Sequence, residues 1–138
     1  MPTQKAGSIL INLETKKIGL VYREKFKDYS FPKGHLEKGE TLAECAVRET
    51  EEETMRANHL YSNNVIATLS YTTSTGEEAE NHMYISIDDG ETTKNIQDVD
   101  KEVLKWASID EVESLLSYED LKNFWKSVKN KVYKIMYE

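Results

Sequence analysis

A capped helical segment whose inward face changes from apolar to acidic constrains the fold of this chain more than any other feature. Thr41-Leu42-Ala43-Glu44 has the S/T-x-x-E form of a capping box, which predicts a helix with Thr41 as its N-cap that continues to about Arg56. At about 100° per residue, one face of this helix carries three small or apolar side chains and then three carboxylates. In chain order these residues are Leu42, Cys45, Ala46, Glu49, Glu52 and Glu53. The opposite face, expected toward solvent, carries Glu44, Glu51 and Thr54.

The three carboxylates on this face need a positive partner. Glu49 is three residues from Glu52 and four from Glu53, and like charges at these helical spacings repel by roughly 0.2–0.5 kcal/mol even on an open surface. Arg48 can pair with Glu44 or Glu52, but one guanidinium cannot neutralise the whole cluster. A hard divalent cation such as Mg²⁺ or Mn²⁺ takes oxygen ligands of this kind. The helix therefore predicts a metal site, with a solvated acidic face as the alternative.

The rest of the chain mixes strand and helix patterns. Apolar and β-branched runs joined by a charged turn predict a hairpin, and further strands follow later in the chain. The strands are expected at residues 6–12, 18–22, 65–72, 82–87 and 104–107, with loops over 23–40, 73–80 and 88–100. Two more helices are expected, a short one through Leu116 with Ser108 as its N-cap and an amphipathic one over residues 121–135. This mixture predicts one domain, residues 1–138, built as an α/β sandwich.

The composition narrows the classes of partner. The chain has 25 acidic and 18 basic side chains, for a formal net charge of -7. Such a chain is a poor match for polymeric nucleic acid, whose binding depends on phosphate neutralisation by Lys and Arg. No apolar run is long enough for a membrane span, and the first residues lack the apolar core of a secretory signal, so a cytoplasmic location is expected. Cys45, the single cysteine, is expected to be a packed helix residue.

One extended motif resembles the signature of the Nudix hydrolases. It has the form G-x5-E-x7-R-E-x-x-E-E and consists of Gly34, Glu40, Arg48, Glu49, Glu52 and Glu53. The similarity extends to Ala6-Gly7, to Phe31-Pro32-Lys33-Gly34-His35 and to Trp106 before a Ser-initiated helix. The resemblance implies a Nudix-type α/β/α sandwich with a mixed sheet. It also implies metal-dependent hydrolysis of a nucleoside diphosphate linked to another group.

The resemblance assigns roles to the acidic face. Glu52 and Glu53 are expected to bind Mg²⁺ or Mn²⁺, and Glu49 is either a third metal ligand or the group that accepts a proton from water. Arg48 would orient Glu49 or Glu52, or would form a plain surface ion pair with Glu44.

Three residues depart from the family pattern. Thr50 occupies a place that is usually apolar, and Met55 and Arg56 stand where a glycine and an aliphatic residue are expected. A glycine at position 55 would let the helix end in a left-handed turn. Methionine there suggests a helix that runs on, or an altered exit loop.

Candidate substrate contacts lie on both sides of the helix in sequence. The stretch from Phe31 to His35 resembles the same region of diadenosine polyphosphate and diphosphoinositol polyphosphate hydrolases. Lys33 and His35 are candidate phosphate contacts, with solvated loop residues as the alternative, and Gly34 allows close backbone approach. Tyr71 resembles a downstream tyrosine of the dinucleoside polyphosphate group that stacks on adenine, but its position in an alternating strand also fits a place in the core.

A further acid from a later loop is expected to act as general base or extra ligand. Glu102 is favoured over the other acidic loop residues, which are Glu77, Glu78, Glu80, Asp98 and Asp100. The expected function is a pyrophosphohydrolase of dinucleoside polyphosphates, acting on a small nucleotide as a monomer or homodimer. The alternatives are a hydrolase of modified nucleoside triphosphates and a Nudix-fold module that binds nucleotide without turnover.

Overall fold

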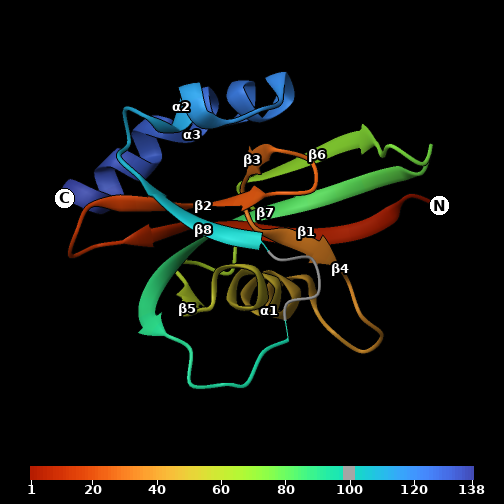
Figure 1. Cartoon of the computed structure of the whole chain (residues 1–138), viewed down its shortest axis with the longest axis horizontal. Coiled ribbons are helices and arrows are strands. Elements are labelled where there is room, and N and C mark those ends of the chain that lie inside the picture. The colour runs from red at the N-terminus through yellow and green to blue at the C-terminus, as the bar shows by residue number, and fades with distance from the viewer. Residues whose placement is uncertain (98–101) are drawn as a thin grey trace.

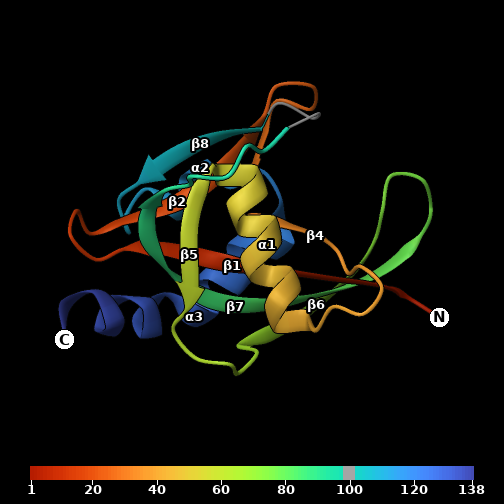
Figure 2. The ribbon, with the colours of Figure 1, turned by 90° about the horizontal axis from the view of Figure 1, so that it is seen from below.

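A mixed eight-stranded sheet lies between two helical layers, as the sequence predicted (Figure 1). The computed structural model describes residues 1–97 and 102–138. The strands are β1 (Thr3–Asn12), β2 (Lys17–Arg23), β3 (Asp28–Ser30), β4 (Lys33–His35), β5 (Arg56–Leu60), β6 (Ala67–Thr72), β7 (Glu78–Glu91) and β8 (Glu102–Ala107). The helices are α1 (Leu42–Thr54), α2 (Val112–Leu115) and α3 (Glu119–Tyr137). Figure 2 shows α1 on one face of the sheet, with α3 behind it on the other.

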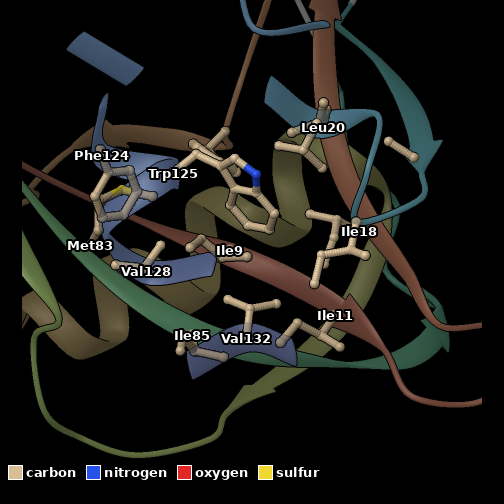
Figure 3. Packing of buried hydrophobic residues seen from close by; sticks show 14 of the residues in the cluster. Ile9, Ile11, Ile18, Leu20, Met83, Ile85, Phe124, Trp125, Val128 and Val132 are labelled. Atoms are coloured by element: carbon tan, nitrogen blue, oxygen red, sulfur yellow. The ribbon is translucent and has the colours of Figure 1, made fainter. Parts of the chain in front are cut away.

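Strand β1 forms the centre of the sheet. It pairs antiparallel with β2 and β4 and parallel with β7, from Thr3 opposite Ala79 to Ile11 opposite Ile87. Both of its faces are covered, so its side chains are buried without interruption from Ala6 to Ile11. The larger core lies between the sheet and α2 and α3, where Ile9 and Ile11 meet Trp125 and Val132 (Figure 3).

Several predicted loops are strands in the structure. The expected loop over 23–40 contains β3, which pairs with β2, and β4, which pairs with β1. Strand β4 begins after Pro32, so each of its residues has an amide hydrogen for the pairing. Strand β5 was missed altogether, and β7 extends into both loops expected around residues 82–87. The pairing of β7 with β1 satisfies its backbone and overrides its polar composition.

The two helix caps differ in their outcome. The capping box of α1 is confirmed, since Thr41 Oγ1 accepts from the Glu44 amide at 3.1 Å and Glu44 Oε1 accepts from the Thr41 amide at 2.9 Å. At the second site only half of the box forms, because the Ser108 amide donates to Glu111 at 2.8 Å but α2 begins at Val112. The amphipathic helix α3 is confirmed and is longer than expected at both ends.

The prediction that Glu51 and Thr54 face solvent is wrong. Glu51 is buried because the segment after β7 covers this face of α1. From that segment, Thr92 Oγ1 and Lys94 Nζ donate to the Glu51 carboxylate at 2.7 and 2.9 Å. Thr54 is also buried, and its hydroxyl donates to the Thr50 carbonyl at 2.6 Å. Helix α1 is therefore covered on two sides. None of the helices in the described part of the chain has the length and apolar character needed to cross a membrane.

The polar residues that depart from the family pattern have partners. The Thr50 hydroxyl is 2.6 Å from the Ser8 hydroxyl, which is 2.8 Å from that of Ser86, and all three side chains are fully buried. The Arg56 guanidinium donates two bonds to Asp88, at 2.9 and 2.7 Å. These hydrogen bonds offset the cost of burying polar groups where the family has apolar ones.

Helix α1 does not run on past its usual end. It stops at Thr54, and Met55 itself takes the left-handed conformation, with φ 60° and ψ 29°. Its amide donates to the Glu51 carbonyl at 2.8 Å, and β5 begins at the next residue. Met55 thus makes the turn that a glycine would make, at a conformational cost that glycine avoids.

We expect Met55→Gly to raise the free energy of unfolding by about 0.5–1 kcal/mol, because glycine adopts this conformation without strain. Turnover should stay within a few-fold of the natural rate, since the helix end keeps its geometry. Denaturant unfolding checks the first outcome, with Met55→Ala as the control that removes the same side chain but keeps Cβ. A glycine variant no more stable than the alanine variant would contradict the prediction.

Candidate active site

Arg48 joins the carboxylates on the acidic face of α1. Its Nε and Nη2 donate to Glu40 at 2.6 and 2.9 Å, and its Nη1 donates to Glu49 at 2.6 Å and to Glu52 at 3.2 Å. The hydrogen bonds from Arg48 lower the pKa of Glu40 to about 2. The expected pairing of Arg48 with Glu52 is confirmed, whereas Glu44 closes the capping box instead.

Gly34 lies directly against Glu49. A Cβ atom at position 34 would overlap the Glu49 carboxylate, so only glycine leaves room for that side chain where it lies. Burial raises the pKa of Glu49, and the hydrogen bond from Arg48 opposes this effect. Strand β4 therefore supports the acidic face through its backbone.

Glu53 connects α1 to β4 and β8. Its Oε1 accepts from the Lys33 amide at 2.9 Å. Burial raises its pKa well above the ordinary range, and the negative charge of Glu102 raises it further. The structure thus brings Glu102 close to the acidic face. Two alternatives to Glu102, Asp98 and Asp100, lie outside the described residues.

The acidic residues of the loop expected over 73–80, which precede Glu102 in the chain, have other surroundings. Glu78 and Glu80 belong to β7, where they accept hydrogen bonds from Thr72 at 3.2 Å and from Gln4 at 2.7 Å. Glu77 is exposed in the turn between β6 and β7. The structure brings none of these three to the acidic face in the described part of the chain.

A cavity of about 400 Å³ lies next to Lys33, a volume typical of small-molecule sites. Its lining includes the cations Lys5, Arg23 and Lys33 and the aromatic rings Phe26, Tyr71 and Tyr118. Burial lowers the pKa of Lys33, and the carboxylate of Glu53 opposes the shift. The amide of Lys33 thus contacts the acidic face while its side chain lines the cavity. A cationic and aromatic cavity in a chain of net charge -7 suits an anionic ligand with a ring.

Tyr71 and His35 occupy different environments. Tyr71 is half-buried in the cavity wall, and Lys5 Nζ lies 5.5 Å from the centre of its ring. The side chain of His35 is exposed and does not line the cavity, and its carbonyl accepts from Arg48 Nη2 at 2.9 Å. Cys45 is buried, and burial raises the pKa of its thiol to about 12, as expected for a packed residue.

The cavity residues that sequence reasoning missed include Lys5, Arg23, Asn81 and Tyr118. Arg23 donates two bonds to Asp28, at 2.9 and 2.6 Å, and the Tyr118 hydroxyl donates to the same carboxylate. The hydrogen bond from Arg23 lowers the pKa of Asp28. Arg23 and Asp28 carry opposite charges on either side of the short turn between β2 and β3, and this was a local signal for their ion pair. No local signal places Lys5 beside Asn81, because their pairing joins β1 to β7.

The donor set on the acidic face suits a hard cation. Among the described residues no three acidic, imidazole or thiolate groups converge as a ready metal site, because Arg48 lies between Glu49 and Glu52 and Glu53 turns to the Lys33 amide. These carboxylates nevertheless offer only oxygen ligands, which are the ligands that Mg²⁺ and Mn²⁺ prefer. A cation would also relieve the repulsion that raises the pKa of Glu53. Binding would require these side chains to turn.

Comparisons with known proteins agree with this geometry. The family model for the NUDIX domain matches residues 1–133. A Nudix-family hydrolase from Clostridium perfringens superposes with a TM-score of 0.78 at 18% identity, covering 98% of this chain and 99% of that one. An Ap4A hydrolase from C. elegans superposes with a TM-score of 0.71 at 18% identity, covering 97% of this chain and 99% of that one. A NUDIX hydrolase from Nitrosomonas europaea superposes with a TM-score of 0.73 at 19% identity, covering 98% of this chain and 90% of that one. The likeness to these structures confirms the predicted fold class.

Proposed function

The chain belongs to the Nudix family of hydrolases, which act on phosphoric anhydride bonds, and from that premise we propose that it hydrolyses a dinucleoside polyphosphate with the help of Mg²⁺ or Mn²⁺. The observation that carries this proposal is the position of Lys33. Its amide contacts Glu53 on the acidic face, and its side chain lines the neighbouring cavity. A ligand with its base in the cavity would therefore present its phosphates to the carboxylates of α1.

The roles follow from these positions. Glu52 and Glu53 would hold the metal, with Glu49 as a third ligand or as the acceptor of a proton from water. A bound metal supplies charge stabilisation on phosphate oxygens and an activated water. Arg48 would orient Glu49 and Glu52, to which it already donates, and Gly34 leaves room for Glu49. Glu102 is the proposed additional acid, since its charge already acts on Glu53.

Two features favour a dinucleoside substrate. The cavity has a volume suited to one nucleoside and is separate from the acidic face, so a second nucleoside would extend past the carboxylates. Lys33, which lies between the cavity and the acidic face, suits the charge of a polyphosphate chain that leads from one to the other. The similar structure of a C. elegans Ap4A hydrolase supports the same substrate class.

A substrate panel in Mg²⁺ and isotopically labelled water tests the proposal. Its members are diadenosine polyphosphates, nucleoside triphosphates with natural and modified bases, and nucleoside diphosphate sugars. We expect kcat/KM for a diadenosine polyphosphate to exceed that for any triphosphate by at least about tenfold, because the substrate binds on both sides of the acidic face. The position of the label identifies the phosphorus attacked.

Two results would contradict the proposal. Preference for modified triphosphates would indicate a role in cleansing the nucleotide pool. Tight nucleotide binding without turnover of any panel member, in either Mg²⁺ or Mn²⁺, would indicate a binding module. A parallel panel with a chelator is the control for metal dependence.

A further inference from the structure

Two buried polar atoms in the wall of the cavity lack partners. Asn81 is 1% exposed, yet its Oδ1 has no hydrogen-bond partner among the described residues, and the same holds for the buried hydroxyl of Tyr71. Both residues line the cavity next to Lys33. An unpaired buried polar atom costs about 1–3 kcal/mol, so two in one wall call for an explanation.

The orientation of the Asn81 amide follows from its neighbour. Its Nδ2 lies 3.2 Å from the sulfur of Met83, two residues further along β7. A thioether sulfur accepts hydrogen bonds and cannot donate them, so the amide nitrogen is the end that faces it. The end of the Asn81 amide that is left without a partner among the described residues is therefore an acceptor, Oδ1, and not a donor.

The sheet holds this acceptor rigidly among groups that suit a nucleotide. Asn81 lies opposite Lys5 of β1 and Leu69 of β6, so strands on both sides fix its backbone. Tyr71 follows Leu69 by two residues and lies on the same face, with its ring near Lys5. The wall thus combines an apolar surface, a ring, a cation and two unpaired polar atoms.

We propose that Asn81 and Tyr71 determine base specificity by reading the edge of an adenine bound in this cavity. The 6-amino group of adenine would donate to Asn81 Oδ1, and the Tyr71 hydroxyl would donate to a neighbouring ring nitrogen. The choice of adenine rests on the proposed function, whereas the pairing of a base donor with Asn81 rests on the unpaired atom alone. This assignment adds an amide of β7 to the site and gives Tyr71 a role other than stacking on the base or packing in the core.

Binding of nucleoside monophosphates without added metal tests the inference apart from hydrolysis. The probes are adenosine 5′-monophosphate and purine riboside 5′-monophosphate, which differ only in the 6-amino group. We expect the natural protein to bind the adenosine probe about 5- to 20-fold more tightly, because the other probe leaves Asn81 Oδ1 unpaired. Asn81→Leu should bring the ratio of the two dissociation constants close to one. Asn81→Asp, which keeps an acceptor, should retain a preference for the adenosine probe.

Matched controls separate recognition from folding. Asn58 of β5 is another asparagine with a buried, unpaired Oδ1, but it does not line the cavity, so Asn58→Leu should leave the ratio unchanged. Tyr71→Phe should reduce the ratio, while Tyr84→Phe, buried on the α1 side, should not. Thermal unfolding of each variant confirms that the binding protein is folded.

The outcomes are decisive in both directions. Equal affinity of the natural protein for the two probes, or an unchanged ratio in folded Asn81→Leu, overturns the inference. If Asn81→Leu does not fold, the ratio in Asn81→Asp decides, and loss of the preference there overturns it. A ratio that depends on Asn81 in a protein that fails to hydrolyse diadenosine polyphosphates supports the inference while refuting the proposed function.

Discussion

Glu53→Gln is expected to lower kcat by at least about a hundredfold while the protein stays folded. The substitution removes the charge of a proposed metal ligand but keeps an acceptor oxygen for the Lys33 amide, which now donates to Glu53 at 2.9 Å. Glu52→Gln should have a similar effect on kcat. Steady-state rates at saturating Mg²⁺ check both variants.

The stability of Glu53→Gln gives an independent readout. The pKa of Glu53 is raised by burial and by Glu102, so the folded chain holds this proton to a higher pH than the unfolded chain does. The contribution of Glu53 to the free energy of unfolding therefore falls as pH rises from the unfolded pKa of this side chain through its folded pKa. At neutral pH the glutamine variant without metal should unfold at the same or a higher temperature than the natural protein.

Glu44→Gln is the matched control for these carboxylates. It removes one charge from the same helix on the exposed side, and glutamine can still accept from the Thr41 amide in the capping box. Its kcat should stay within about twofold of the natural value. Near-normal rates in both Glu52→Gln and Glu53→Gln would show that the metal site lies elsewhere.

Gly34→Ala is expected to lower kcat by at least about tenfold with a smaller effect on KM. An added methyl group would overlap the Glu49 carboxylate and displace it from Arg48, so a group proposed to act on the attacking water would lose its position. Because the nucleotide base would bind in the cavity and not against Gly34, ground-state binding should change less.

Two further variants test whether crowding of Glu49 causes this loss. Gly39→Asn changes a glycine with φ of 80° and open space around it, a conformation that asparagine tolerates, so its kcat should stay within a few-fold. The Glu49→Gln variant already has a reduced kcat, so adding Gly34→Ala to it should lower kcat much less than Gly34→Ala does in the natural protein. Fully additive losses would mean that Gly34 acts independently of Glu49.

The acidic face of α1 could be predicted because its signals are local. Thr41 and Glu44 specify where the helix starts, and the helical period then places Glu49, Glu52 and Glu53 on one side. The end of the helix has no such local signal, since Met55 takes a conformation that its side chain disfavours. The buried chain of hydroxyls from Thr50 through Ser8 to Ser86 explains why a polar residue is tolerated on the helix, and it depends on two strands far away in sequence.

By itself the sequence determined the helix that carries the acid cluster, the first hairpin and the amphipathic helix α3, because capping, turn and periodicity signals act between residues close in the chain. Only the tertiary structure decided that β1 pairs parallel with β7, which sets Lys5 beside Asn81, and that Glu102 approaches Glu53. It also decided that Glu51 is buried beneath Thr92 and Lys94. These contacts join residues that are distant along the chain. Their formation depends on how both faces of the sheet are covered as a whole, and no local pattern encodes that arrangement.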